Sequence, residues 1–344
     1  MKKKIVAALK YILFLSVGLT LLWLALRGLD LSKIGLEFRQ AKYFWIILSL
    51  IPALIAHVSR AARWNIMINA LGYKTTLGTT FHATIMGYFA NTIFPRLGEV
   101  TRCTVLSRKQ NIPLNGLFGT VISERIFDVI CIAIIGFFVI IAQFSFLRGF
   151  LDKMIWSHLS EQMPSGLRLV TLLGISVLLA VVLFYFLLRF SMPMIRKLSF
   201  YKKLKDLLLG FLAGIKTIGT LKRKKEFIAH TILIWFMYFL MSYLPFRAIQ
   251  ATEHLSLIDG TTLLMMGSFA MVIPVPAGIG AYHWIVTRTL TDLFGIVSES
   301  AASYAVLAHA SQLIFVVLLG GISMLVVMVH KTQALNVKIR SHTE

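Results

Sequence analysis

Charged residues are scarce in this sequence. Only 14% of its 344 residues are charged, whereas 58% are hydrophobic, and the mean hydropathy is +0.80. Soluble domains are far more polar than this, and no polar stretch here is long enough to form a soluble enzyme domain. The composition therefore predicts an all-α polytopic membrane protein whose chemistry takes place within or against the bilayer.

Cysteines and the familiar catalytic motifs are also lacking. The two cysteines, Cys103 and Cys131, show neither CxxC nor Cys/His spacing, which leaves no disulfide framework and no metal signature. HExxH, GxSxG, a Walker loop and a strand-preceded GxGxxG are absent as well, and these are the motifs typical of soluble catalysis. We therefore expect reduced cysteines in packing roles, no metal, no cofactor and no assigned catalytic residue.

Acidic side chains are few, at 14 against 35 lysines and arginines, and the net charge is +21. In membrane proteins such an excess of basic residues sits mostly in cytoplasmic loops that face anionic headgroups. The expected partners are therefore membrane lipids with anionic headgroups and not nucleic acid. The sequence leaves a homo-oligomer open.

About six apolar runs are predicted to cross the membrane. A crossing needs roughly 20 apolar residues, which cover about 30 Å of hydrocarbon as a helix. The first run follows three lysines and shows no cleavage site, so it is expected to stay as an anchor with the N-terminus inside. The predicted spans are Ile5–Leu26, Tyr43–Val58, Leu117–Ala142, Leu167–Leu188, Phe227–Ile249 and Ala301–Val329.

Basic residues set the predicted orientation. The connector 189–226 is the most basic segment and is expected to be cytoplasmic. Because the second span ends inside and the third begins inside, residues 77–116 must enter the membrane and return. Their arms, Thr79–Phe94 and Glu99–Ser107, are too short and too charged for two ordinary spans, which favours a re-entrant hairpin.

The same argument places a second hairpin between Ile249 and Ala301, entering from the opposite face. Its sequence repeats part of the first at a constant offset of 180 positions, which matches Met86, Gly87, Phe89, Ala90 and Ile93 with Met266, Gly267, Phe269, Ala270 and Ile273. Six full spans and two oppositely oriented re-entrant hairpins then form an inverted repeat, with halves of about 1–143 and 167–330. Residues 1–344 are predicted to be one integral membrane domain.

Polar residues gather where the first hairpin breaks, at Asn91, Pro95, Arg96, Glu99 and Arg102. A helix break exposes backbone amides that can meet an anion, and arginines bind phosphate through charge-assisted bonds. We predict that a phosphate headgroup binds here, with Glu99 paired to Arg102 or holding a cation. The alternative is that these are interfacial charges beside a proline kink.

A second charged group lies within the third span. Glu124 and Asp128 share a helix face, and Arg125 reaches Asp128 at i+3 spacing. Charge inside a span is costly and is usually paired or functional. These residues are either a proton or cation relay beside the first hairpin or a structural ion pair.

The second hairpin breaks at Pro274, Pro276, Gly278 and Gly280, followed by His283. Proline removes backbone donors and glycine allows close backbone approach, so these residues are predicted to bind substrate. A protein-packed turn satisfies the same backbone, and His283 is equally a structural hydrogen-bonding residue.

Two further polar groups are given structural roles. His57, Arg60 and Trp64 fall on one helix face, where interfacial anchoring is expected. His309 and Gln312 either line a cavity or bond across helices.

Four motifs together resemble the lysylphosphatidylglycerol synthase transmembrane family, the flippase-like membrane region of multiple-peptide-resistance factors. They are RW at Arg63–Trp64, NTIFPRLGEVTR at Asn91–Arg102, ERIFD at Glu124–Asp128 and PVPAGIG at Pro274–Gly280. The resemblance covers nearly the whole chain. This chain has Ala277 where the family usually has Gly and His283 where it often has Glu, and the family's soluble aminoacyl-transferase domain is missing.

The resemblance implies a stand-alone unit that translocates or binds a phosphate-bearing lipid in the bacterial inner membrane. The basic residues near both ends of the chain predict that both termini are cytoplasmic. One alternative is a membrane enzyme that modifies a lipid headgroup, with Glu124, Asp128 or His283 as base. Another is a scaffold that recruits lipids or partners through the basic connector 189–226.

Overall fold

The computed structural model describes residues 2–143 and 221–340, and within these ranges the chain forms helices and no strand. Contacts group Met1–Val139 with Ile218–Glu344 into one compact unit, to which all the packing described below belongs. The helices in chain order are α1 (Lys2–Leu26), α2 (Leu31–Gln40), α3 (Tyr43–Leu48), α4 (Leu50–Ala70), α5 (Leu77–Ile93), α6 (Leu97–Gln110), α7 (Leu114–Ala142), α11 (Lys224–Tyr243), η3 (Leu244–Ala248), η4 (Gln250–Thr252), α12 (Leu257–Ala270), η5 (Pro276–Gly278), α13 (Ala281–Arg288), η6 (Thr289–Leu293) and α14 (Ser298–Arg340).

Four helical stretches are long and apolar enough to cross a membrane, namely Tyr43–Ala70, Leu114–Ala142, Lys224–Ala248 and Ser298–Val329. A fifth candidate is the pair formed by Tyr11–Leu26 of α1 and Leu31–Gln40 of α2, which are bent by 86° from each other, if the pair counts as one span. The prediction of an all-helical, multi-pass protein is confirmed. The predicted span Leu167–Leu188 lies outside the described residues, so the number of six spans stays a prediction.

The first predicted hairpin is present as α5 and α6, which break between Phe94 and Arg96. Proline lacks the donor that would continue α5, and Arg96 adopts a left-handed conformation (φ 63°) that turns the chain back. The Asn91 side chain accepts a 2.6 Å hydrogen bond from the Gly98 amide. A Cβ on Gly98 would overlap the Gly87 carbonyl oxygen, so only glycine allows the arms to approach this closely.

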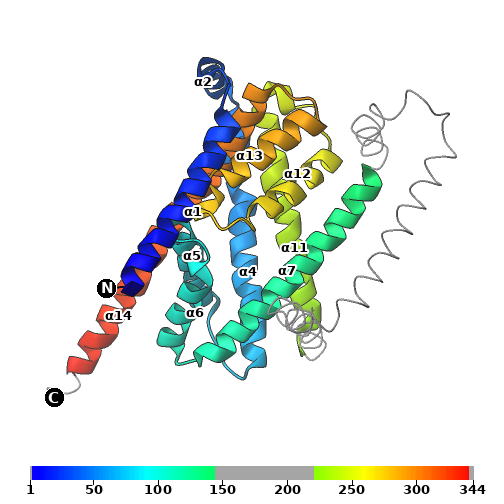
Figure 1. Cartoon of the computed structure of the whole chain (residues 1–344). Coiled ribbons are helices and arrows are strands. Elements are labelled where there is room, and N and C mark those ends of the chain that lie inside the picture. Colours follow the sequence, from blue (N-terminus) through cyan, green and yellow to red (C-terminus); the bar gives the residue numbers. More distant parts are fainter. Residues whose placement is uncertain (1, 144–220, 341–344) are drawn as a thin grey trace, which may run out of the picture. The chain divides into compact units, whose positions relative to one another are not determined.

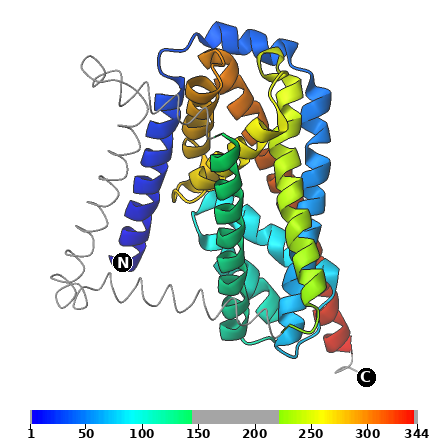
Figure 2. The same cartoon turned by 90° about the vertical axis from the view of Figure 1, so that its right-hand side faces the viewer.

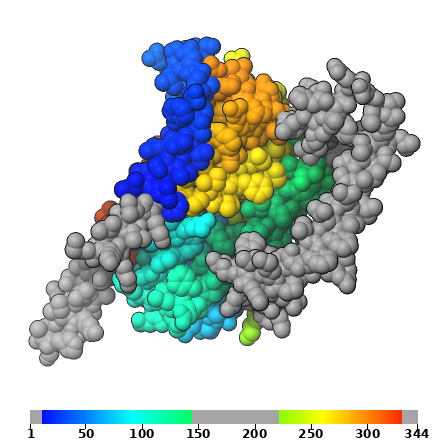
Figure 3. Space-filling model, viewed as in Figure 1, coloured from blue at the N-terminus to red at the C-terminus, as the bar shows by residue number. Residues whose placement is uncertain are grey.

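The second hairpin is built differently, from α12, a longer break at Met271–Gly280 that includes η5, and α13. Ser256 and Asp259 form a capping box that begins α12. Gly280 has a φ of 82°, and a Cβ there would overlap the Gly18 carbonyl oxygen of α1. The break therefore fits directly against the α1 backbone, and Figure 3 shows α1 in blue along this part of the surface.

The two hairpins lie toward opposite ends of α4, with α5 and α6 at one end and α12 and α13 at the other (Figures 1 and 2). Their breaks meet where the Arg96 guanidinium lies 3.4 Å from the Val272 carbonyl oxygen. The repeat partners Gly87 and Gly267 occupy comparable places, since each allows close contact with the second arm of its own hairpin. Both predicted breaks are thus present, while membrane entry from opposite faces and the inverted repeat stay predictions.

Each hairpin has its own buried apolar core. Trp64, Ile68, Ala83, Leu106 and Leu117 form the core beside the first hairpin, which also includes Cys103. A second core lies beside the other hairpin and contains Ile46, Phe246, Leu263, Val286 and Tyr304. Both cysteines are free, as predicted, and Cys103 is buried.

Candidate functional site

Five charged side chains from three helices meet beside the first hairpin. Arg60 and Arg63 come from α4, Arg102 from α6, and Glu124 and Asp128 from α7. Spacings of three and four residues place each pair on one helix face. We call these five residues the ion cluster.

The contacts within the ion cluster are direct. Glu124 accepts hydrogen bonds from Arg60 and, at 3.1 Å, from Nη1 of Arg102. Its Oε1 also lies 3.4 Å from Nη2 of Arg63. Asp128 accepts a 2.8 Å bond from Arg63 and a 3.1 Å bond from Arg60. Each carboxylate is therefore shared by more than one guanidinium group.

The ion cluster is almost completely buried. The Arg63 and Glu124 side chains are 0% exposed, and Asp128, the most accessible of the five, is 11% exposed. Burying charge is costly unless every charge is paired with good geometry. Three arginines face two carboxylates here, so the ion cluster carries one excess positive charge.

Arg125 and Glu99 extend the ion cluster toward the protein surface, and because their charges cancel, the excess positive charge stays. Arg125 Nη2 lies 3.2 Å from Glu99, and its Nη1 lies 3.4 Å from Asp128. The predicted i+3 contact between Arg125 and Asp128 is therefore present. In this arrangement Glu99 pairs with Arg125, and Arg102 pairs with Glu124.

Aromatic side chains support the guanidinium groups. The Arg102 guanidinium carbon lies 4.8 Å from the centre of the Trp64 ring, and Trp64 donates a 2.8 Å hydrogen bond to Thr120. Arg60 donates a 2.8 Å bond to the Tyr238 hydroxyl. Stacking of a guanidinium on an aromatic face adds a further favourable contact.

The expectation that His57, Arg60 and Trp64 anchor the protein at the membrane interface is wrong. All three are buried, and Arg60 is ion-paired. The physical reason is that α7 places two carboxylates opposite this face of α4. The sequence carries a signal for this pairing that was missed. Arg60 and Arg63 are three residues apart and Glu124 and Asp128 are four apart, so each pair presents its charges on one face of its helix.

A small polar cavity lies beside the ion cluster, lined by Thr84, Tyr88, Asn91, Arg102 and Arg125 among others. Its volume is about 10 Å³, which is roughly the room that one water molecule needs. Several buried polar atoms at this cavity, namely Nε and Nη2 of Arg102, the Tyr88 hydroxyl and the Thr84 hydroxyl, have no partner within the part of the chain that the structure describes. The site therefore has unused hydrogen-bonding capacity but little space.

The predicted residues of the first hairpin are only partly brought together. Glu99 and Arg102 join the ion cluster and its rim, along with Glu124, Arg125 and Asp128. Asn91 lines the small cavity and also holds the hairpin closed through Gly98. Arg96 and Pro95 lie at the break itself, where Arg96 is exposed.

The residues of the second break form a separate group without ionic contacts among the described residues. Pro276 and Gly278 bound η5, and Gly280 precedes α13. Nε2 of His309 in α14 donates a 2.9 Å bond to the Ala277 carbonyl of η5. His283 is buried and its Nδ1 accepts from the Gly280 amide at 3.2 Å. The two histidine rings are 4.8 Å apart, centre to centre. Pro274 lies at the middle of the break, upstream of these contacts.

His309 and Gln312 bond across helices, one of the two roles expected for them. Gln312 donates a 3.3 Å bond to Ser49 at the start of α4. In residues 2–143 and 221–340, no three His, Cys, Asp or Glu side chains lie close enough together to hold a metal ion.

Three relatives bear on the identity of this chain. A UPF0104 membrane protein of Pyrococcus horikoshii is 24% identical over 92% of this chain and 96% of its own length. A second UPF0104 membrane protein, from Methanocaldococcus jannaschii, is 34% identical, but over only 28% of this chain and 31% of its own. Glycosyltransferase AglD of Haloferax volcanii is 23% identical over 85% of this chain, which spans about half of that protein's length.

No solved structure is significantly similar to this chain. The family profile described as the lysylphosphatidylglycerol synthase TM region matches residues 9–320, which include the ion cluster and both hairpins. The chain therefore belongs to the lysylphosphatidylglycerol synthase TM region family.

Proposed function

We propose that this protein translocates, or binds for translocation, a lipid with a phosphate in its headgroup, either a phospholipid or an isoprenoid phosphate. The observation that carries the proposal is the excess positive charge of the ion cluster, with unpartnered Arg102 nitrogens at a polar cavity among the described residues. A buried unpaired charge is strongly unfavourable. An anionic headgroup supplies the missing counter-charge.

The arginines have separable roles in this proposal. Arg96 lies exposed at the hairpin break and meets the headgroup first. Arg102 and Arg125 line the cavity and hold the phosphate through charge-assisted hydrogen bonds. Glu99 and Glu124 keep these guanidinium groups in place. When the phosphate leaves, the two carboxylates replace it as partners of the guanidinium groups.

The small volume of the cavity requires the first hairpin to move. With room for about one water molecule, the site admits a phosphate only when α5 and α6 separate from α7. The close arms of the hairpin, joined at Gly87 and Gly98, favour movement as a unit. The second hairpin, with its break at Met271–Gly280, forms the opposing wall, and Pro274, Pro276, Gly278, Gly280 and His283 keep their predicted role there.

The membrane and its orientation are part of the proposal. We place the chain in a bacterial inner membrane, as one integral domain with both termini cytoplasmic. Lysines at both ends of the chain and the basic connector 189–226 support this orientation through the positive-inside rule. Protection of terminal tags from protease added outside spheroplasts tests it.

Transport in proteoliposomes tests the function. We expect wild type to move fluorescent anionic phospholipid or isoprenoid phosphate faster than protein-free vesicles. Arg102→Gln should lower the rate by about 10–100-fold, since hydrogen bonds to charged groups contribute about 1.5–3 kcal/mol. Arg96→Ala should lower it less, because Arg96 lies at the break and outside the buried ion cluster.

Arg108→Ala is the matched control, since Arg108 is an exposed arginine at the far end of the same helix. Its rate should equal that of wild type. The proposal fails if wild type is no faster than empty vesicles, or if Arg102→Gln transports as well as Arg108→Ala.

A group-transfer function is the second candidate, and the name of the Haloferax relative, glycosyltransferase, is what favours it. Against it, Glu124 and Asp128 are both held by guanidinium groups, which suits counter-charges better than general bases. Mass spectrometry of lipids from cells with and without the protein separates the two, because only an enzyme creates or removes a covalent lipid species.

A further inference from the structure

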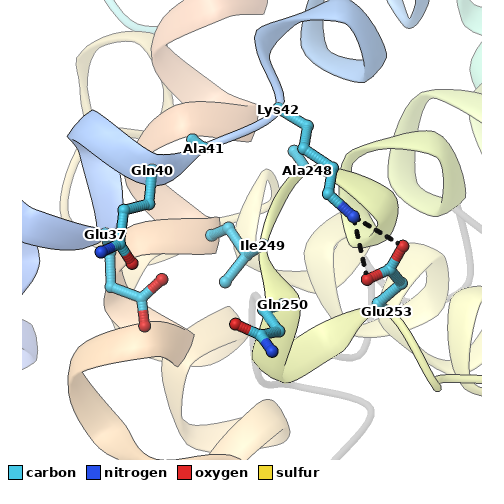
Figure 4. Close-up of a pocket in the computed structure, with 8 residues that line it drawn as sticks. All are labelled: Glu37, Gln40, Ala41, Lys42, Ala248, Ile249, Gln250 and Glu253. Atoms are coloured by element: carbon cyan, nitrogen blue, oxygen red, sulfur yellow. Dashed lines mark hydrogen bonds and ion pairs between the residues drawn. The ribbon is translucent and has the colours of Figure 1, made fainter.

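A second and much larger cavity lies where α2 and the η3–η4 segment face each other (Figure 4). Its volume is about 310 Å³, which is in the lower range of small-molecule sites. Glu37 and Gln40 line it from the α2 side, and Gln250 and Glu253 line it from the opposite side. None of its residues belongs to the ion cluster. We call it the α2 pocket.

The walls of the α2 pocket are fixed by contacts between distant parts of the chain. The Lys42 amide donates a 2.9 Å bond to the Ala248 carbonyl. The Lys42 ammonium binds both oxygens of Glu253, at 2.9 and 3.1 Å. Glu37 accepts a 2.5 Å bond from Ser300 of α14. The pocket is therefore preformed, which lowers the cost of ordering a bound ligand.

Two carboxamides in the lining are unused. No described residue bonds the side chains of Gln40 or Gln250, and each offers two donor hydrogens and an acceptor oxygen. Glu37 has a second carboxylate oxygen that can accept a bond from a ligand. Ala41, Ala248 and Ile249 add apolar surface between these polar groups. The lining thus alternates donors, acceptors and small apolar patches.

The charge balance argues against a phosphate in this pocket. Lys42 and Glu253 neutralise each other, which leaves Glu37 as the uncompensated charge of the lining. A net negative lining disfavours anions, in contrast to the ion cluster. With one carboxylate and two neutral carboxamides, the rest of the lining offers mostly uncharged hydrogen-bonding groups.

We propose that the α2 pocket binds a neutral polyhydroxyl group the size of one sugar ring, either as a free sugar or as part of a lipid headgroup. Hydroxyl groups both donate and accept, which matches the two carboxamides and Glu37. A volume of about 310 Å³, at the lower end of small-molecule sites, suits a single ring and not an acyl chain. This site is separate from the proposed phosphate site and does not depend on transport.

Direct binding to the purified full chain tests the proposal. The first probe is methyl glucoside, measured by calorimetry with the protein in detergent that contains no sugar. The second is a monoglucosyl diacylglycerol, measured with the protein in nanodiscs. We expect saturable binding of one or both probes. Gln250→Leu and Gln40→Leu should each raise the Kd by about 3–10-fold, the effect of losing one neutral hydrogen bond.

Gln110→Leu is the matched control, since Gln110 ends α6 and is not part of the α2 pocket. Binding of both probes indicates that the sugar ring is sufficient, and binding of the glucolipid alone assigns the site to a lipid headgroup. The proposal is overturned if neither probe binds, if the pocket variants bind as Gln110→Leu does, or if inorganic phosphate or ethanolamine competes better than methyl glucoside.

Discussion

The two helical hairpins differ in what holds them. The first is fixed to α7 by the buried ion pair between Arg102 and Glu124, and Glu124 is also paired with Arg60 of α4. The second has no buried ion pair among the described residues and is fixed by backbone fit, with Gly280 against Gly18 and His309 bonded to Ala277. Charge pairing tolerates small shifts in position, whereas close backbone packing does not.

This difference suggests that the two hairpins have different roles. Ion pairs that are shared among several partners can exchange with an anionic ligand, so the first hairpin suits binding and movement. A glycine-dependent backbone fit leaves no such freedom, so the second hairpin suits a fixed wall. The variants below test whether the first hairpin is sensitive to charge and the second to volume.

The largest effect is expected from Glu124→Gln. The change leaves Arg60, Arg63 and Arg102 buried with only Asp128 as counter-charge. Removing one partner of a buried ion pair costs about 3–5 kcal/mol, so the free energy of unfolding should fall by about that much. Chemical denaturation of purified protein in mixed micelles measures it.

Glu226→Gln is the control for this prediction. Glu226 pairs with Arg223 near the start of α11, but both side chains are about half exposed. Exposed pairs contribute little, so no change in unfolding is expected. If Glu124→Gln were as stable as Glu226→Gln, the ion cluster would not be what fixes the first hairpin.

A smaller loss is expected from Gly280→Ala in the second hairpin. The new Cβ meets the Gly18 carbonyl oxygen, and the residue must keep a φ of 82°. A Cβ at positive φ costs about 1–2 kcal/mol and overpacking about 1–3 kcal/mol, so we expect a loss of about 2–5 kcal/mol in the same denaturation experiment.

Gly295→Ala isolates the packing contribution. Gly295 also has a positive φ, of 67°, but a Cβ added to it would meet no atom within 4 Å among the described residues. Only the conformational cost of about 1–2 kcal/mol remains there. Equal losses for the two variants would contradict the close fit between α1 and the second break.

The positions of the two helix breaks were predicted from the sequence, whereas the side-chain contacts around the hairpins were not. Pro95 and the Pro–Gly run at 274–280 mark helix breaks through local chemistry, and the breaks lie there. The roles of Arg60 and Arg63 were missed because basic residues at the end of a span are typical of an interface. Only packing of α4 against α7 shows that their counter-charges lie at Glu124 and Asp128, far along the chain.

The same reason explains why the α2 pocket was not predicted. Its walls come from residues 37–42 and 248–253, which are polar in ways that no local motif distinguishes. In contrast, Glu124 and Asp128 were recognised as a unit, since i+4 spacing on one helix is a local signal. Local patterns therefore located the charges, and tertiary packing decided their partners.

The smallest effect is expected from Ala277→Gly, and its sign is favourable. Ala277 has a φ of 53°, a left-handed conformation that costs a residue with a Cβ about 1–2 kcal/mol. Glycine removes that strain but loses more entropy on folding, by about 0.5–1 kcal/mol. The free energy of unfolding should therefore rise by about 0.5–1 kcal/mol. Ala281→Gly, which changes the first residue of α13 instead, should lower it. A loss of stability in Ala277→Gly would mean that the second break is held by the Ala277 methyl group and not by its backbone.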